Sequence, residues 1–150
     1  KTKEATIYEN PRALPRVLFV GRAEKAGFEA ILATGRWPDF DPRASVLIED
    51  APTDNSVPGT GSARITVYRN NEVVVATESE RGGWVVLNDV WHPWWRAEID
   101  GEPARLHRAN VLFRAVRVAG GRHTVRFVFR PMAGLLESLA GRRPPPPPPQ

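Results

Sequence analysis

The sequence predicts a mainly β protein, an antiparallel β-sandwich of the jelly-roll or immunoglobulin-like kind, with one short α-helix near residues 22–36. Three observations lead to this fold class. Short runs rich in β-branched and aromatic residues alternate between apolar and polar positions. Glycine- and asparagine-containing turn signals divide these runs. One window, residues 22–36, repeats its apolar residues at helical spacing instead.

The domain organisation follows from length and composition. A chain of 150 residues with 41% hydrophobic and 25% charged residues suits one globular domain. We expect residues 1–131 to form a single β-sandwich domain. Residues 132–150 are expected to form a C-terminal tail, whose run of prolines favours an extended polyproline II linker. The chain has no cysteine, which excludes disulfides and thiolate metal sites.

The first third of the chain combines three short strands with the helix. Within 22–36, Ala26 and Ala30 recur at helical spacing together with larger apolar residues, and Gly35 suits the C-terminal end of a helix. A polar loop rich in proline and glycine follows at residues 51–62. The strands predicted in this part are residues 5–8, 16–20 and 44–49.

The rest of the chain is predicted to be almost entirely β. Its strands are residues 63–68, 72–79, 84–90, 95–100, 111–118 and 122–130. Asp100-Gly101 is a strong hairpin signal, because a type I′ turn needs positive φ angles. Gly120-Gly121 is a second signal of this kind. Residues 84–90 are apolar in both phases, which predicts a central strand that is covered on both faces.

Two neighbouring tryptophans direct attention to a possible binding surface. Trp94 and Trp95 must point to opposite faces if both lie on a strand. Trp95 shares a phase with Ala97 and Ile99 and is therefore expected in the core. Trp94 is left on the polar side, and three interpretations of it stay open. It could be a sugar-stacking platform, a membrane-interface anchor, or a half-buried residue that covers the end of the sandwich.

The candidate ligand-binding residues are those around this tryptophan. They are Asp89, Trp91, His92, Trp94 and Arg96. Their hydrogen-bonding groups and aromatic rings are the side chains that sugar recognition needs.

Signatures of catalysis and of metal or cofactor binding are missing from the sequence. It has no phosphate-binding glycine loop and no nucleophile elbow. His107 and His123 are expected to be ordinary polar or edge residues, and no metal or cofactor is expected. Asp39 and Asp41 could serve acid–base chemistry, but their Asp-x-Asp-Pro setting favours a turn. The domain is therefore predicted to be non-catalytic.

The basic residues suggest anionic partners. The net charge is +4, and Glu102 and Glu137 are the acidic residues that oppose the arginines after residue 100. This imbalance keeps open a second function, a basic binding module for an anionic polymer or lipid surface. Nucleic acid is not expected, because the nearby phenylalanines alternate with arginine and face inward, and no RNP-type motif occurs. The arginines on adjacent predicted strands are Arg114, Arg117, Arg122, Arg126 and Arg130.

Three segments together are similar to a known family. They are YENPRALPRVLFVG (8–21), FDPRASVLIE (40–49) and HPWWRAEIDGEPARLHRANVLFRAVRVAGGRHTVRFVFRP (92–131). These segments resemble the extracytoplasmic C-terminal region of the YfhO-like bacterial membrane proteins, which are similar to glycosyltransferases of the GT-C class. The most specific part is the pattern Pro-x-Trp-x-Ala-x-x-Asp-Gly that begins at Pro93. The family usually has glycine where this chain has Trp94.

The resemblance implies where and how the domain works. It implies a domain on the periplasmic face of the cytoplasmic membrane, joined to an N-terminal multi-span region of the same protein. The acidic catalytic residues of GT-C proteins lie in that membrane region. The domain would then be an accessory module that acts as a lid, as a contact for a glycan or lipid-linked sugar, or as an assembly surface, and the membrane surface is a further expected contact.

Overall fold

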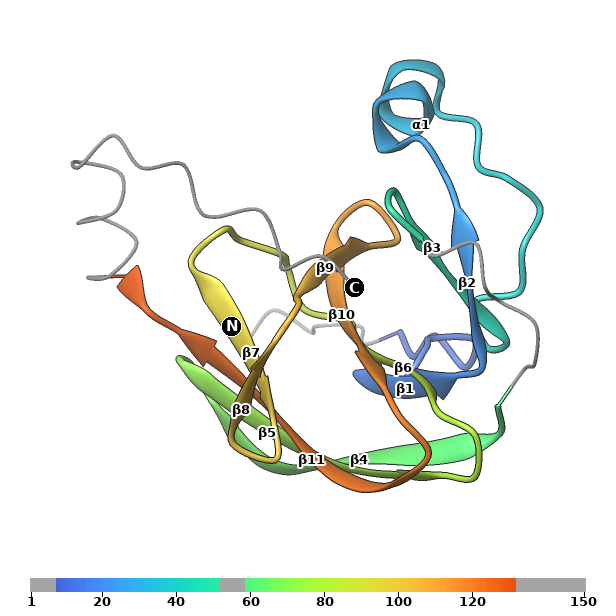
Figure 1. Ribbon diagram of the computed structural model, residues 1–150. Coiled ribbons are helices and arrows are strands. Elements are labelled where there is room, and N and C mark those ends of the chain that lie inside the picture. The colour runs from blue at the N-terminus through green and yellow to red at the C-terminus, as the bar shows by residue number, and fades with distance from the viewer. Residues whose placement is uncertain (1–7, 52–58, 132–150) are drawn as a thin grey trace, which may run out of the picture.

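The computed structural model describes residues 8–51 and 59–131, and within these ranges it is a two-sheet β structure with one short helix (Figure 1). The mainly β sandwich predicted from the sequence is confirmed. The six-stranded sheet has the order β1 (Val17–Val20), β6 (Gly83–Leu87), β10 (Phe113–Val118), β9 (His107–Ala109), β3 (Ser45–Ile48), β2 (Arg22–Lys25). The five-stranded sheet has the order β4 (Gly61–Arg69), β5 (Glu72–Ser79), β11 (Gly121–Phe129), β7 (Trp95–Ile99), β8 (Glu102–Ala104).

Some sequence predictions fall outside these ranges. Most of the strand expected at residues 5–8, most of the loop at 51–62 and the whole tail at 132–150 lie outside the described residues.

The main core lies between the two sheets. The six-stranded sheet contributes Val85, Leu87 and Val116, and the five-stranded sheet contributes Val75 and Phe127, all fully buried. This packing explains the period-two pattern of the strands, because alternate side chains reach the space between the sheets.

A second buried cluster occupies the other face of the six-stranded sheet. Trp84 and Val86 on β6 pack there with Val20, Val46 and Ile48. The sheet curls around this cluster, since β2 at one edge also contacts β6 near the other edge. β6 is therefore buried on both faces, as its doubly apolar sequence predicted.

The predicted helix is shorter than residues 22–36. Its first part forms β2, which pairs in parallel with β3 and buries Ala23 opposite Val46. Sheet pairing outweighs the helical spacing there, because local propensity is weak against tertiary burial. The helix α1 (Phe28–Thr34) begins after Gly27 and ends at Gly35, which adopts φ +67° and donates its N–H to the carbonyl of Ile31, 2.8 Å away.

The two hairpin signals have different outcomes. Asp100 and Gly101 adopt φ +53° and +89° and join β7 to β8 in an antiparallel hairpin, as predicted. The hairpin prediction at Gly120-Gly121 is wrong, because β10 and β11 lie in different sheets and this turn crosses between them. Glycine is needed there for close approach: a Cβ on Gly120 would lie 2.4 Å from the carbonyl oxygen of Glu80. The short strands β8 and β9 were not predicted.

Candidate functional site

The loop between β6 and β7, residues 88–94, contains four of the five candidate site residues. Its backbone is held on both sides. Asn88 donates its N–H to Arg16 O (2.8 Å) and its side-chain amide to Pro15 O (2.7 Å). Trp91 donates its N–H to Leu112 O at 2.7 Å. The loop is therefore fixed between the segment before β1 and the turn before β10.

An aromatic edge forms where this loop meets the end of β11. We define it as His92, Trp94 and Phe129. The His92 and Trp94 rings lie 4.9 Å apart at 73°, and the His92 and Phe129 rings 5.4 Å apart at 70°. Trp94 and Phe129 are half-buried and His92 is exposed, so the edge leaves aromatic surface open to solvent. Its edge-to-face contacts are those that aromatic rings prefer.

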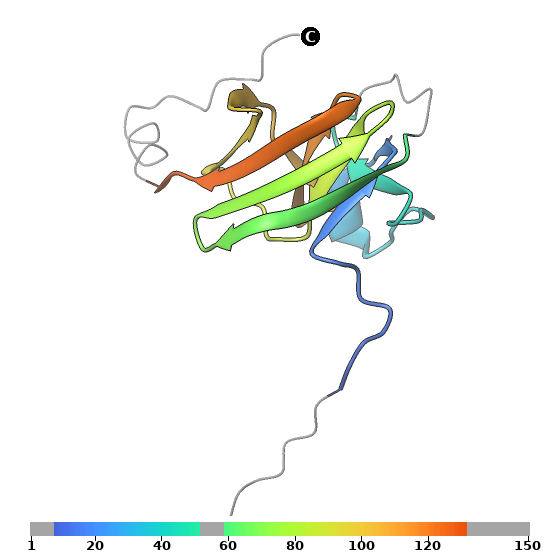
Figure 2. The ribbon, with the colours of Figure 1, turned by 90° about the horizontal axis from the view of Figure 1, so that it is seen from below.

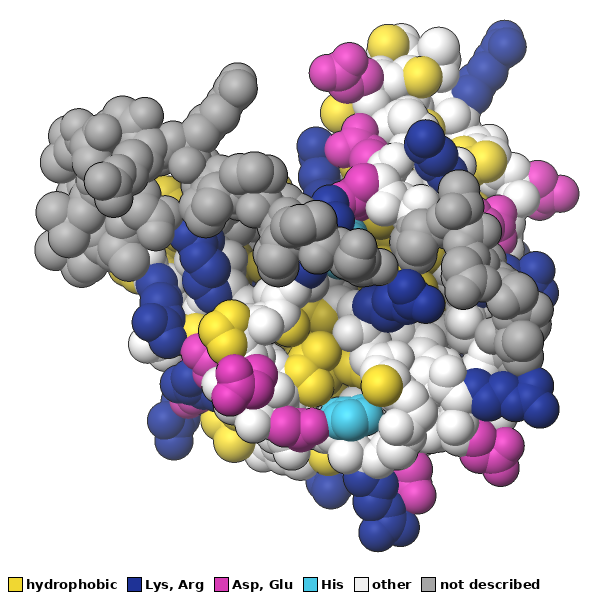
Figure 3. Space-filling model, in the orientation of Figure 1, with side chains coloured by type: hydrophobic (Ala, Val, Ile, Leu, Met, Phe, Trp, Pro, Cys, Tyr) yellow, Lys and Arg dark blue, Asp and Glu magenta, His cyan; other side chains and the backbone are white. Residues whose placement is uncertain are grey.

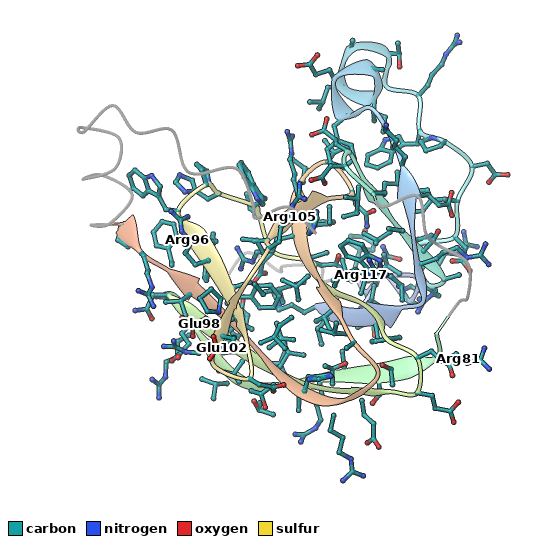
Figure 4. All side chains as sticks on the ribbon, in the orientation of Figure 1. Arg81, Arg96, Glu98, Glu102, Arg105 and Arg117 are labelled. Carbon is teal, nitrogen blue, oxygen red and sulfur yellow. The ribbon has the colours of Figure 1, made fainter. Side chains whose placement is uncertain are left out.

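The backbone fixes Trp94 within this edge. Its N–H donates to His92 Nδ1 at 3.2 Å, and its carbonyl accepts the N–H of Arg130 at 3.0 Å. Arg96, the fifth candidate residue, lies on β7, and its guanidinium donates to the carbonyls of Pro93 (2.6 Å) and Trp95 (3.1 Å). Arg96 thereby closes the turn beneath the edge (Figure 4). The structure thus brings His92, Trp94 and Arg96 into one local unit.

Trp95 is the first residue of β7 and lies on the core side of this strand. It packs against the inter-sheet core and lies 5.3 Å from the Phe129 ring. The Arg114 guanidinium lies 3.7 Å from the centre of its ring. Trp94 lies outside β7, and both tryptophans are half-buried and neighbour Phe129, but only Trp95 packs against the inter-sheet core.

Asp89 has a structural role rather than a place in the aromatic edge. Its carboxylate is paired with Arg16 at 2.5 Å and Arg114 at 3.3 Å, and it accepts the Tyr68 hydroxyl at 3.2 Å. A bulge between Ile65 and Val67 shifts the alternation of β4 by one residue. Tyr68 therefore lies opposite Val73, and its hydroxyl reaches Asp89.

Arg114 is the residue that sequence reasoning misplaced most. It was predicted on a basic surface, but it is 2% exposed and lies between the sheets. One Nη donates to Val90 O at 2.9 Å, and Nε has no hydrogen-bond partner among the described residues. Burial lowers its pKa to about 10, although Asp89 acts in the opposite direction. Its inward phase was visible in the sequence, because Arg114 alternates with Val116 and Val118.

The arginines that were expected on adjacent strands do not share one sheet. Arg114 and Arg117 belong to the six-stranded sheet, and the arginines of β11 to the other. The arginines on β11, and Arg130 directly after it, are paired across the outer face of the five-stranded sheet: Arg126 with Glu72 (2.7 Å) and Glu98 (2.9 Å), Arg130 with Glu98 (3.1 Å), and Arg122 with Glu78 (3.0 Å). The visible face in Figure 3 likewise shows acidic side chains interspersed with basic ones.

Two histidines that were expected to be ordinary form His–Asp pairs. His107 Nδ1 lies 3.0 Å from Asp50, which also pairs with Arg105, and the His107 ring packs edge-on against Trp84 at 5.0 Å. Burial and, to a smaller extent, repulsion by the positive charge of Arg105 lower the pKa of His107 to about 4.

The second pair lies at the β7–β8 turn. His123 Nδ1 lies 2.6 Å from Asp100, and this hydrogen bond raises the pKa of His123 and lowers that of Asp100. The Asp100 side chain also accepts the N–H of Thr124 at 2.8 Å.

Asp41 has the turn role that its sequence setting predicted. Its carboxylate accepts the N–H of Arg43 at 2.9 Å, and its carbonyl accepts those of Ala44 and Ser45.

Within residues 8–51 and 59–131, no cluster of His, Asp and Glu could hold a metal ion. In the same ranges no helix is long and apolar enough to cross a membrane.

The segment before β1 joins the body beside the aromatic-edge loop, through the hydrogen bonds of Asn88. Its described part runs away from both sheets (Figure 2).

Comparison of the chain with models of protein families, with curated proteins and with solved structures finds no match.

Proposed function

We propose that this chain is a non-catalytic accessory domain of a YfhO-like polytopic membrane protein, on the periplasmic face of the cytoplasmic membrane, and that it contacts the glycan part of a lipid-linked sugar through the aromatic edge. The observation on which the proposal depends is the edge itself. His92, Trp94 and Phe129 present half-open rings beside the guanidinium of Arg96. Rigid aromatic faces with a few polar groups beside them are typical of small-molecule recognition.

The position of the edge supports a lipid-linked ligand. In a YfhO-like parent the membrane region precedes this domain. The chain then arrives at Pro15 and Arg16, directly beside the loop of the aromatic edge. This end also carries exposed apolar side chains: Val90 within the loop is 69% exposed, and Leu112, whose carbonyl accepts the Trp91 N–H, is 55% exposed. A sugar attached to a membrane lipid would meet this end of the domain first.

The test is a binding screen with neutral oligosaccharides and lipid-linked sugars, followed by isothermal titration calorimetry. Trp94→Ala should abolish saturable binding. The matched control is Trp37→Ala. It removes a half-exposed tryptophan that stacks on Phe40 in the segment after α1, outside the aromatic edge. Equal binding by wild type and Trp94→Ala would refute the role of the edge.

A salt series separates this proposal from the anionic-surface alternative. Stacking of a neutral sugar should change little between 50 and 500 mM salt, because no ion pair is formed. Binding that needs anionic vesicles and disappears at high salt would favour the alternative function.

A further inference from the structure

The backbone carbonyls beneath the aromatic edge already accept hydrogen bonds from within the chain. The carbonyls of His92 and Trp94 each accept a backbone N–H at 3.0 Å. The carbonyls of Pro93 and Trp95 accept the Arg96 guanidinium at 2.6 and 3.1 Å. A ligand that has to donate hydrogen bonds therefore finds few partners in the backbone of this edge.

The rings of the edge supply the opposite kind of group. Because Nδ1 of His92 accepts the Trp94 N–H at 3.2 Å, the proton of the neutral imidazole lies on Nε2. Neither this Nε2–H nor the indole N–H of Trp94 donates to a residue within the described ranges 8–51 and 59–131. The edge thus combines two ring N–H donors with the apolar faces of partly open aromatic rings.

Polyproline is the ligand chemistry that matches this combination. A proline has no N–H, and it offers a ligand site only a carbonyl acceptor and an apolar ring. Proline-rich segments in the polyproline II conformation dock on aromatic-lined surfaces, and their preformed helix keeps the entropic cost of binding low. The chain carries such a segment itself, since residues 144–149 are six consecutive prolines.

We infer that the aromatic edge is the docking site of the chain's own proline segment, residues 144–149. The rings of Trp94 and Phe129 pack against the proline rings, and the ring N–H groups of Trp94 and His92 donate to the segment's carbonyls. The inference goes beyond the proposed function and does not depend on it, because a sugar would reach the same rings only by displacing this segment.

The position and length of the tail allow this contact. Arg130 donates its N–H to Trp94 O at 3.0 Å, so the chain leaves β11 directly at the aromatic edge. Residues 132–143 then precede the first proline. A connection of this length spans up to about 40 Å, about twice the ~19 Å length of six residues in polyproline II. Tethering at short range gives an effective concentration on the order of 1 mM, so even a weakly binding segment is held in place.

The first experiment compares the full chain with an interrupted-proline variant, which carries Pro145→Gly, Pro147→Gly and Pro149→Gly and keeps the length and charge of the tail. The indole N–H signals are followed by nuclear magnetic resonance. We expect the Trp94 signal to differ between the two chains, while the signal of Trp37, a half-exposed tryptophan outside the edge, stays in place. The difference should persist on tenfold dilution, because the contact lies within one chain.

The second experiment titrates the interrupted-proline variant with a hexaproline peptide that is blocked at both ends. The Trp94 signal should return saturably towards its position in the full chain, and a glycine–serine peptide of equal length should not move it. Calorimetry then compares two further changes in the same variant. Trp94→Phe keeps a ring but removes the indole donor and should weaken peptide binding about fivefold, the equivalent of one net hydrogen bond. Trp37→Phe should leave it unchanged.

Four outcomes would overturn the inference. Identical Trp94 signals in the full chain and the interrupted-proline variant would mean that the tail does not occupy the edge, even if the free peptide binds. A difference that disappears on dilution would assign the contact to a second copy of the chain. Equal changes at Trp94 and Trp37 would show an effect that is not specific to the edge. Equal peptide binding by Trp94→Phe and Trp37→Phe would refute the match of donors and acceptors.

A separate titration keeps this inference apart from the proposed function. Neutral oligosaccharides are added to the interrupted-proline variant, in which the tail does not compete for the edge. Failure of the sugar to bind there would count against the proposed function and leave the docking of residues 144–149 intact.

Discussion

Replacement of the buried arginine tests how the two sheets are held together beside the candidate site. Arg114→Met keeps most of the side-chain volume but removes the charge between Asp89, Val90 O and the Trp95 ring. Even with Asp89 beside it, the charged form is disfavoured. The pKa near 10 corresponds to about 3 kcal/mol of desolvation that methionine would recover.

The interactions that Arg114→Met removes contribute more to stability than the desolvation that it recovers. Asp89 keeps Arg16 and the Tyr68 hydroxyl, so the loss of its ion pair with Arg114 costs about 3 kcal/mol, the low end for a buried pair. The carbonyl of Val90 loses its donor, which adds about 1 kcal/mol. A desolvated cation–π contact adds about 2 kcal/mol. We therefore expect Arg114→Met to lower the free energy of unfolding by about 2–4 kcal/mol.

Urea denaturation followed by circular dichroism measures this difference. Arg117→Met is the matched control, because Arg117 lies on the same strand but is exposed, and such changes usually stay within about 0.5 kcal/mol. If the two variants lose equal stability, the account of Arg114 as a link between the sheets is wrong.

Three further variants test the fold. Trp95→Ala should cost about 3–5 kcal/mol, as deletions of core aromatic residues do, and Trp94→Ala much less; equal large losses in urea denaturation would contradict the place of Trp95 against the inter-sheet core and of Trp94 outside it. Stability should fall as the pH is lowered from about 6.5 to about 4, by up to about 3 kcal/mol, since the unfolded chain protonates His107 in that range and the folded chain does not. His107→Gln should flatten this slope, and the same slope in the variant would assign it to other groups. Gly101→Ala should cost about 1–2 kcal/mol in the same assay, because Gly101 adopts φ +89° in open space; no loss would mean that the turn relaxes.

Much of the architecture could be predicted because one physical rule governs it. Alternation along β11 separates the buried Val125 and Phe127 from the outward Arg126, and it does so without knowledge of the partner strands. The double apolar pattern of β6 likewise requires cover on both faces, whatever provides it.

The errors arise where distant segments decide the outcome. Arg22–Lys25 forms a strand because β3 lies beside it, and no local pattern encodes that pairing. Gly120-Gly121 has the composition of a hairpin, but it joins strands of different sheets and passes close to the connection between β5 and β6, and neither fact is encoded locally.

The candidate site was predicted only in part, because some of its contacts are local and others join segments that are distant in the sequence. Residues near Trp94 in the chain were expected to act with it, and His92 and Arg96 do lie beside it because loop contacts are local. Asp89 is only five positions away, yet Arg114, Arg16 and Tyr68 from three other strands or their ends hold its carboxylate. Phe129 completes the aromatic edge from a strand more than thirty positions along, and the sequence had no signal for this contact.

The most direct test of the aromatic edge follows the indole N–H signals of the tryptophans by nuclear magnetic resonance during titration with neutral hexose oligosaccharides at millimolar concentration. The Trp94 and Trp37 signals are assigned from their alanine variants. The account predicts a saturable shift of the Trp94 signal while the Trp37 signal stays in place. A Trp94 signal that does not move, or equal shifts of both signals, would contradict glycan contact at this edge.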